Sequence, residues 1–240
     1  MPKSIVISER VLALLPEFHR GVVIASGLTV AEQNPPLERT LCEMQMRCAA
    51  FLRDNPQPPE LAVWEETYKR FNVNPRKHRP AVCQLADRVR QSSRPLPFIN
   101  EPVAIFNIIS LTPEYLRPCG GDDLDQIAGD LMLDLADGTE TFEPLGRPGT
   151  VERPDAGEII YVDSKSKSIM CRRLNWRNGH PTRITSNTKD LVINIDGMSN
   201  PQQTRQATAE LARLLAETCG GAVVTDFLDV GHPHITLPSA

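Results

Sequence analysis

The sequence predicts an α+β fold in which helices pack against a mixed central sheet, with residues 1–240 forming one domain. Helical patterns lie before residue 112, strand-like runs follow Gly120-Gly121, and a helix–strand unit at 199–228 closes the chain. Because helices and strands are grouped rather than alternating, layered α+β packing is favoured over a doubly wound parallel sheet. A hydrophobic fraction of 40% is enough for a sizeable core.

In the first half of the chain, short apolar runs at 4–8 and 21–26 predict strands. Helices are predicted where apolar residues recur every three or four positions or where proline suits a first turn. These helices lie at 37–53, at 60–71, from Pro80 to near Arg90, and from Pro102 onward.

In the second half, glycine-punctuated runs predict strands at 131–135, 141–145, 158–163, 168–175 and 191–196. The last helix has the clearest signals, because Asn200 can cap it and Pro201 suits its first position. We expect Ala207, Leu211, Leu214, Leu215 and Thr218 on its buried face. Gly220-Gly221 ends the helix, and a strand follows at 222–228.

The net charge of −4 conceals a strong segregation. Residues 69–94 hold eight Lys/Arg against one acid, and residues 164–189 hold seven with none. Between them, residues 114–163 carry 13 acids and three arginines. Two readings are equally open: the basic stretches form a footprint for nucleic acid, or they pair with the acidic segment in the fold.

Several classes of protein are disfavoured. No apolar run approaches the length of a membrane span, and the N-terminus is interrupted too early for a signal peptide. The six cysteines form no CxxC pair, so we expect reduced, mostly buried thiols in a cytoplasmic protein. No cofactor is expected, and we assign no metal site to His232 and His234, which lack a third ligand.

Two segments carry candidate binding chemistry. In residues 71–80, Arg76, Lys77 and Arg79 can contact phosphate, which predicts salt-sensitive tRNA binding; alternatively, their charges are simply solvated. In residues 96–111, Asn100, Asn107 and Ser110 stand among apolar residues. They either cap backbone groups or line a pocket for the ammonium or carboxylate of an amino acid.

The third segment is residues 171–177, followed by Thr185 and Thr188. On a strand, Arg173, Asn175 and Arg177 would share one face and Arg172, Leu174 and Trp176 the other. A row of Arg, Asn and Arg can hold phosphate or carboxylate, or stabilise an oxyanion. Trp176 can stack on a base, although a buried anchor is the commoner role.

The ordered set of motifs between Trp64 and Thr188 resembles a known family. It runs through Tyr68, 71–75, Arg79-Pro80, 96–100, Asn107, Ser110, 120–125, Gly157-Glu158 and 172–177, and it is strongest over about 60–190. These pieces look like stand-alone "B-three/B-four" domain proteins, which are similar to the editing module of the bacterial phenylalanyl-tRNA synthetase beta chain. The resemblance implies an α+β fold and a cleft for the aminoacylated end of a tRNA.

The chain departs from the synthetase module at three places. Glycine, around Gly120, replaces a histidine; Pro181, Thr182 and Arg183 stand where a glutamate occurs; and Ala104 replaces an aspartate. The aromatic-specific chemistry of that module is therefore not transferred. The candidate catalytic groups are instead Asn100, Asn107, Arg173, Asn175 and the backbone amides of Gly120 and Gly121, with substrate contacts from Ser110, Arg172, Trp176, Arg177, Thr185 and Thr188.

Two functions follow from these observations. The first is trans-editing, in which a free-standing domain hydrolyses a mischarged aminoacyl-tRNA. The second is a non-catalytic module that binds tRNA, an amino acid or a nucleotide. The amino acid, the tRNA and the oligomeric state are left open by the sequence.

Overall fold

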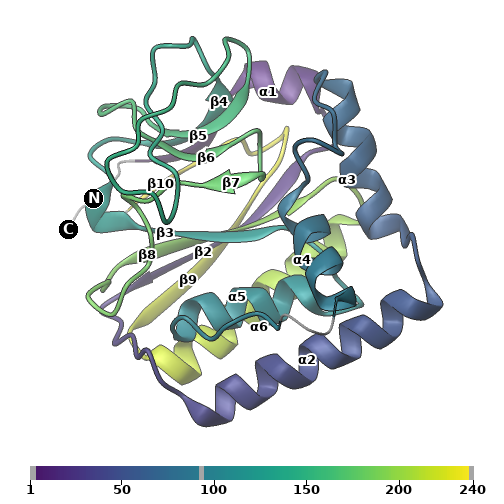
Figure 1. Ribbon diagram of the computed structural model, residues 1–240. Helices are drawn as coiled ribbons and strands as arrows, with labels where there is room; N and C mark the ends of the chain where they lie inside the picture. Colours follow the sequence, from purple (N-terminus) through teal and green to yellow (C-terminus); the bar gives the residue numbers. More distant parts are fainter. Residues whose placement is uncertain (1–3, 92–94, 238–240) are drawn as a thin grey trace.

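The computed structural model describes residues 4–91 and 95–237. Within them two β-sheets are stacked, and the long helices cover the outer face of one of these sheets (Figure 1). One sheet has six strands in the order β10-β1-β4-β5-β6-β7, and the other has four in the order β3-β8-β2-β9. The strands are β1 (Ser4–Ile7), β2 (His19–Ser26), β3 (Cys119–Asp123), β4 (Leu131–Leu135), β5 (Ile159–Asp163), β6 (Ile169–Arg172), β7 (Arg177–Asn178), β8 (Leu191–Gly197), β9 (Ala222–Leu228) and β10 (His234–Thr236).

The long helices pack on the four-stranded sheet on the side away from the six-stranded one (Figure 1). α5 and α6 lie against its strands, α2 lies against α5, and α3 and α4 stand at one end. The helices are α1 (Glu9–Leu14), α2 (Pro35–Asp54), α3 (Pro59–Arg70), α4 (Ala81–Arg90), α5 (Glu101–Leu111) and α6 (Pro201–Cys219), with a 3-10 turn at Leu124–Gln126.

The predicted α+β class is confirmed. β1 and β4 are parallel and the other paired strands of the described chain are antiparallel, so the strand arrangement is mixed, as predicted. The expected central sheet is, however, divided into two layers. The burial pattern explains why, because the two inner strands of the four-stranded sheet, β2 and β8, carry apolar residues on both faces.

β2 contributes to two apolar clusters, one on each face of the four-stranded sheet. Val22 packs between the two sheets, whereas its neighbour Val23 packs under the helices with Ile105 and Leu211. Because successive side chains of a strand point to opposite faces, a strand buried on both sides reads as an unbroken apolar run. The predicted strand at 21–26 is therefore confirmed, and it begins two residues earlier, at His19.

Both ends of α6 form where the sequence predicts them. The Asn200 side chain accepts a hydrogen bond from Gln203 N, and Pro201 occupies the first turn. Gly220 and Gly221 have φ values of 69° and 75°, in the left-handed region that favours glycine. The predicted helix–strand unit is confirmed, with Leu214 and Thr218 half-buried rather than fully buried.

Two predicted strands are wrong in part. Residues 141–145 make isolated bridges rather than a strand, and Pro144 has no N–H to donate to a ladder. The predicted strand at 168–175 stops at Arg172, because Arg173 and Leu174 take φ values of 49° and 65° and turn the chain into β7. The shared face predicted for Arg173, Asn175 and Arg177 is therefore wrong.

The sequence patterns did not reveal α1 or β3. β3 contains Gly120-Gly121, which has low strand propensity, and it is held by pairing with β8. Among the described residues, no helix has the length and apolar character needed to cross a membrane.

Candidate functional site

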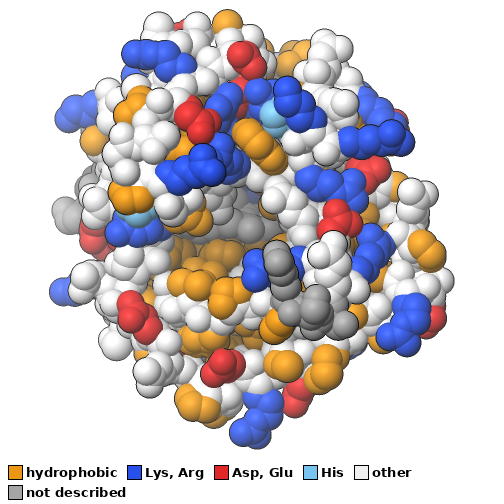
Figure 2. Space-filling model, in the orientation of Figure 1, with side chains coloured by type: hydrophobic (Ala, Val, Ile, Leu, Met, Phe, Trp, Pro, Cys, Tyr) orange, Lys and Arg blue, Asp and Glu red, His pale blue; other side chains and the backbone are white. Residues whose placement is uncertain are grey.

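Three adjoining cavities form a cleft between the four-stranded sheet, the end of the six-stranded sheet and α5. We name them the inner pocket, the apolar bowl and the basic lip, with volumes of about 50, 480 and 380 Å³. Asn178, at the end of β7, lines all three. Figure 2 shows the hollow, with hydrophobic side chains along one side and Lys and Arg side chains along the opposite rim.

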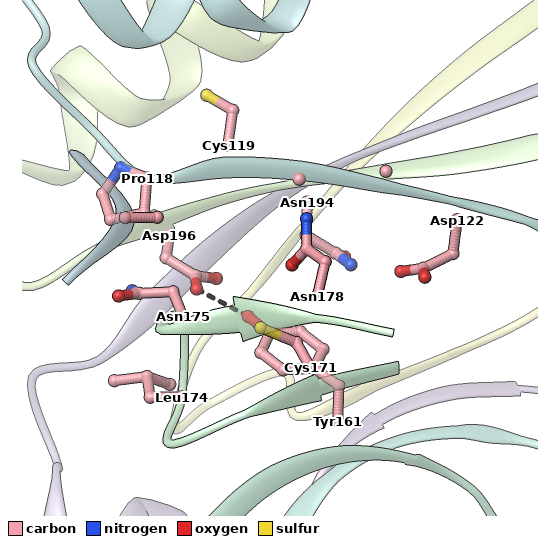
Figure 3. Close-up of a pocket in the computed structure, with 13 residues that line it drawn as sticks. Pro118, Cys119, Asp122, Tyr161, Cys171, Leu174, Asn175, Asn178, Asn194 and Asp196 are labelled. Atoms are coloured by element: carbon pink, nitrogen blue, oxygen red, sulfur yellow. Dashed lines mark hydrogen bonds between the residues drawn. The ribbon is translucent and has the colours of Figure 1, made fainter. Parts of the chain in front are cut away.

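The inner pocket is lined by polar groups from β3, β5, β7 and β8 (Figure 3). Asp122 and Asn194 point from the four-stranded sheet toward the six-stranded one, whereas the Cys119 side chain points to the opposite side of β3. The pocket is completed by Ala81, Pro118, Gly120, Gly121, Tyr161, Cys171, Leu174, Asn175, Asn178 and Asp196.

A buried ionic network closes one wall of this pocket. Arg20, which is fully buried, donates from Nε to Asp196 Oδ1 at 3.0 Å and from Nη2 to the Tyr161 hydroxyl. Tyr161 in turn donates to Asp196 Oδ2 at 2.5 Å. Burial raises the pKa of Tyr161 well above its ordinary value, so the phenol stays protonated. The charge of Asp196 is thus balanced by Arg20.

Asp122 has no such partner. Its carboxylate accepts a hydrogen bond of 2.6 Å from Thr182 Oγ1, and no cation of the described chain lies within ion-pair distance. Burial raises the pKa of Asp122 to about 6, against a lowering by the Thr182 hydrogen bond and by Arg20. A carboxyl group of this kind in a cleft marks a candidate functional residue.

The apolar bowl adjoins the inner pocket at Gly121 and Asp122. Its apolar lining comes from α5, from the chain before it and from two loops, and comprises Ile99, Val103, Phe106, Leu145 and Ile184. Ile99 and Leu145 are 51% and 50% exposed, so the bowl opens to solvent through an apolar rim. The polar part of the wall comprises Asn107, Asp122, Asn178, His180 and Arg183.

The basic lip joins the two basic segments of the sequence. Trp176 and Arg177 line it together with Gln84 and Arg88 of α4. The ring of His78 meets the ring of Trp176 edge-on at 4.5 Å, and Gln84 Nε2 donates to the Trp176 carbonyl at 2.9 Å. These contacts place the segment 72–80, here called the basic loop, beside the lip.

β3 presents an open backbone edge to the cleft. It is the outermost strand of its sheet, and Asp123 N donates away from β8, to Thr182 O. Because N–H directions alternate along an antiparallel strand, the Gly121 N–H points the same way, toward the cleft that Gly121 lines. A Cβ added at Gly120 would meet nothing within 4 Å, so the space above this residue is open.

Six of the predicted site residues line the cleft. Gly120, Gly121 and Asn175 line the inner pocket, Asn107 lines both the bowl and the lip, and Trp176 and Arg177 line the lip. Asn175 is held by Tyr68, whose hydroxyl donates to Asn175 Oδ1 at 3.0 Å.

Other predicted site residues are engaged in structural contacts away from the cavities. Asn100 caps α5, accepting from Val103 N and donating to Ile184 O at 3.1 Å each. Thr188 donates to Asp123 Oδ2 at 2.6 Å and accepts from Thr185 N, so both threonines stabilise a turn. Ser110 is fully buried and lines none of the three cavities.

The arginines of the third segment pair with the acidic segment. Arg172 donates to both oxygens of Glu158, at 2.8 and 2.7 Å, and also contacts Glu152. Arg173 contacts Asp155 and Glu158 and lines no part of the cleft, while Arg177 contacts Glu152. These charges are therefore largely balanced within the fold.

In the basic loop the three predicted tRNA contacts differ from one another. Arg79 is paired with Glu65 and Asp87. Arg76 and Lys77 are exposed and have no ion pair among the described residues. Pairing with the acidic segment is therefore observed for Arg172, Arg173 and Arg177, and the nucleic-acid footprint stays a prediction for Arg76 and Lys77.

The two cysteines of the cleft are poor nucleophiles. Burial raises the pKa of Cys119 to about 12 and raises that of Cys171 further. Because the thiolate is the reactive form, neither side chain suits covalent catalysis near neutral pH. All six cysteines are free thiols, as predicted, but only Cys48, Cys83 and Cys219 are fully buried.

Sequence reasoning missed Asp122, Asn178, His180 and Asn194. Asp122 belongs to a quoted motif, yet two adjacent aspartates give no sign of which one faces a cavity; Asp123 caps a turn instead. Asn178 directly follows the Arg/Asn segment, but its place at the meeting point of three cavities depends on the turn at Arg173-Leu174.

A family model described as the B3/4 domain matches residues 63–220, which is more than half of the chain. The chain belongs to the B3/4 domain family. This confirms the family assignment predicted from the motifs between Trp64 and Thr188.

Among solved structures, an N-terminal fragment of the phenylalanyl-tRNA synthetase beta-subunit from Pyrococcus horikoshii is similar, with a TM-score of 0.47 and 16% sequence identity. The alignment covers 97% of this B3/4 chain and 53% of the fragment, so the chain spans about half the length of that structure. No match was found among curated proteins.

Proposed function

We propose that this B3/4 chain binds the aminoacylated 3′ end of a tRNA in the cleft and hydrolyses the ester of a mischarged one, acting in the cytoplasm. One observation carries the proposal: three cavities of different chemistry meet at Asn178. An aminoacyl-tRNA end likewise joins an anionic backbone, a side chain and a small polar ester within a few ångströms.

The basic lip suits the terminal nucleotides. The nearby Arg76 and Lys77 supply positive charge, and Trp176 supplies an aromatic ring at the edge of the cavity. Phosphate attraction and base stacking are the usual terms in binding single-stranded nucleic acid.

The apolar bowl suits the side chain of the amino acid. It adjoins the lip, with which it shares Phe106, Asn107 and Leu145, so an amino acid attached to a nucleotide in the lip would lie next to the bowl. The ester then falls near Asn178 and Gly121.

Hydrolysis at this position needs little covalent chemistry. An aminoacyl ester is already activated, so a site accelerates water attack by holding the ester and stabilising the oxyanion. The Gly121 N–H at the open edge of β3 and the carboxamides of Asn107 and Asn178 are the candidate donors. The water adds to the carbonyl carbon, the ribose oxygen leaves with a proton, and a free amino acid and tRNA result.

The first test is a deacylation screen with tRNAs mischarged with different amino acids. We expect turnover of at least one ester by the wild type, and a loss of about 100-fold or more in Asn178→Ala, the usual effect of removing an oxyanion donor. Asn187→Ala, at an exposed turn position, is the matched control and keeps wild-type turnover. Rates equal to the uncatalysed rate for every ester contradict the proposal.

The second test addresses tRNA binding. Arg76→Ala/Lys77→Ala is expected to weaken binding and to lower the slope of log K against log salt by about 2, roughly one for each phosphate-binding side chain removed. Arg39→Ala/Arg53→Ala removes two exposed charges from α2, away from the lip, and serves as the matched control. Identical slopes for both double variants contradict a role for the basic loop.

Binding without turnover is the second candidate function. It is favoured by the departures from the synthetase module, because glycine around Gly120 and the segment Pro181-Thr182-Arg183 stand where that module has a histidine and a glutamate. Salt-dependent tRNA binding combined with no deacylation of any ester is the outcome that selects it.

A further inference from the structure

The inner pocket presents two hydrogen-bond acceptors, Asp122 and Asn194 Oδ1, beside one unpaired donor, Asn175 Nδ2, and no cation among its described lining residues. Asp122 and Asn194 face the same space, and no Lys, Arg or His lines it (Figure 3). The charge of Asp196 in the same wall is already balanced by Arg20. Asp122 is therefore the one lining carboxylate of the described pocket whose charge is not balanced by a protein group.

Asn194 supplies a second, independent observation. The residue is 5% exposed, and its Oδ1 has no hydrogen-bond partner. Buried polar atoms are nearly always paired, because an unpaired buried acceptor loses its hydrogen bonds to water without replacement. An acceptor left open toward a cavity indicates that a donor enters from outside the protein.

The size of the pocket limits what can enter. Its volume of about 50 Å³ is far below the 480 Å³ of the apolar bowl, so it suits a small polar group rather than an amino-acid side chain. An ammonium group fits such a space and supplies three N–H donors with a positive charge. A guanidinium or an N-acylated amine is larger, and the acylated amine brings no charge to Asp122.

We infer that the inner pocket is the subsite for the α-ammonium group of the aminoacyl substrate, held by the Asp122 carboxylate and the Asn194 carboxamide oxygen. The inference rests on the proposed function and narrows its substrate class to esters whose α-amine is free. Peptidyl-tRNA and N-acylated aminoacyl-tRNA are then excluded. The subsite adjoins the bowl at Gly121 and Asp122, which lets one amino acid occupy both cavities.

The charge of Asp122 is consistent with this role. Burial raises the pKa of this carboxyl to about 6, so it is mainly ionised at pH 7 but without a counter-charge. An incoming ammonium provides that counter-charge, and the Thr182 hydroxyl holds one carboxylate oxygen in place at 2.6 Å.

The test uses small probes rather than tRNA. The amides of alanine, leucine and phenylalanine and their N-acetyl counterparts are titrated at pH 7 into the full chain by two-dimensional NMR. We expect at least one free-amine amide to bind, its N-acetyl form to bind at least tenfold more weakly, and Asp122→Asn to weaken the free-amine amide at least tenfold. Asp125→Asn, an exposed neighbour, keeps wild-type affinity.

Asn194→Ala is the second variant, and its NMR spectrum reports whether it is folded. In the folded variant we expect weaker binding of the free amine and no change for the acetylated probe. Binding of acetylated and free amides with equal affinity, no binding of any free amide up to its solubility limit, or unchanged binding in Asp122→Asn overturns the inference.

A second arm separates this inference from the proposed function. Each ester that is turned over is compared with its N-acetyl form. Equal rates on both overturn the ammonium subsite and leave hydrolysis standing. Amine-selective probe binding combined with no turnover of any ester leaves the subsite standing and overturns hydrolysis.

Discussion

Replacing Asp122 with Asn is expected to make the protein more stable at neutral pH, although it removes a charged group from the cleft. The carboxyl has an ordinary pKa of 3.8, and burial raises it to about 6 in the folded state. The folded state therefore holds a proton that the unfolded state has already released. Above pH 6 the ionised, half-buried Asp122 lowers the free energy of unfolding.

The magnitude follows from the shift. Each pKa unit corresponds to about 1.4 kcal/mol, so a rise from 3.8 to about 6 amounts to about 3 kcal/mol when fully developed. Below pH 4 the carboxyl is protonated in both states and this cost is absent. Between pH 4 and 6 the wild type loses stability relative to Asp122→Asn, and above pH 7 the difference is constant.

The measurement is urea unfolding of both proteins at several pH values from 4 to 8. The carboxamide oxygen introduced by Asp122→Asn can still accept the hydrogen bond from Thr182, so the substitution changes charge more than geometry. Asp125→Asn, at an exposed position, is the control and should show no such pH-dependent gain. A difference in unfolding free energy that is independent of pH, or that favours the wild type as pH rises, refutes the reasoning.

Two further predictions concern groups outside the proposed subsite. Arg172→Ala should lower the free energy of unfolding, measured with urea, by about 3–5 kcal/mol, because it leaves the buried Glu158 without its bidentate partner. Arg213→Ala, which removes the exposed pair with Glu217 in α6, should lower it by about 0.5 kcal/mol or less in the same assay. Iodoacetamide at pH 8, followed by mass spectrometry, should modify the exposed Cys42 well before Cys119, whose pKa burial raises to about 12; faster labelling of Cys119 would contradict the assigned burial.

The fold could be predicted where local signals and tertiary packing agree. α6 is the clearest case, since its asparagine cap, its proline and the terminating glycines all act within a few residues of the helix ends. β3 is the opposite case. Gly120-Gly121 disfavours a strand locally, and pairing with β8 overrides that preference.

The candidate site was less accessible to prediction. The strand pattern extends through residues 168–175, although Arg173 and Leu174 adopt the left-handed conformation that the sequence does not signal there. That turn brings Asn178 into the cleft and sends Arg173 toward Asp155. The residue types of the segment 171–177 indicated a binding surface, but the sequence did not show which of these side chains face the cleft.

The sequence by itself determined the family, the α+β class and the segregation of charge, because each depends on residue order and composition alone. Only the tertiary structure decided which polar groups are free to act. Arg172 and Asn100 are occupied by partners far along the chain, Glu158 and Ile184, whereas Asp122 and Asn194 are left facing a cavity. Whether a polar side chain is paired or open depends on the groups that folding brings beside it, and local sequence does not contain that information.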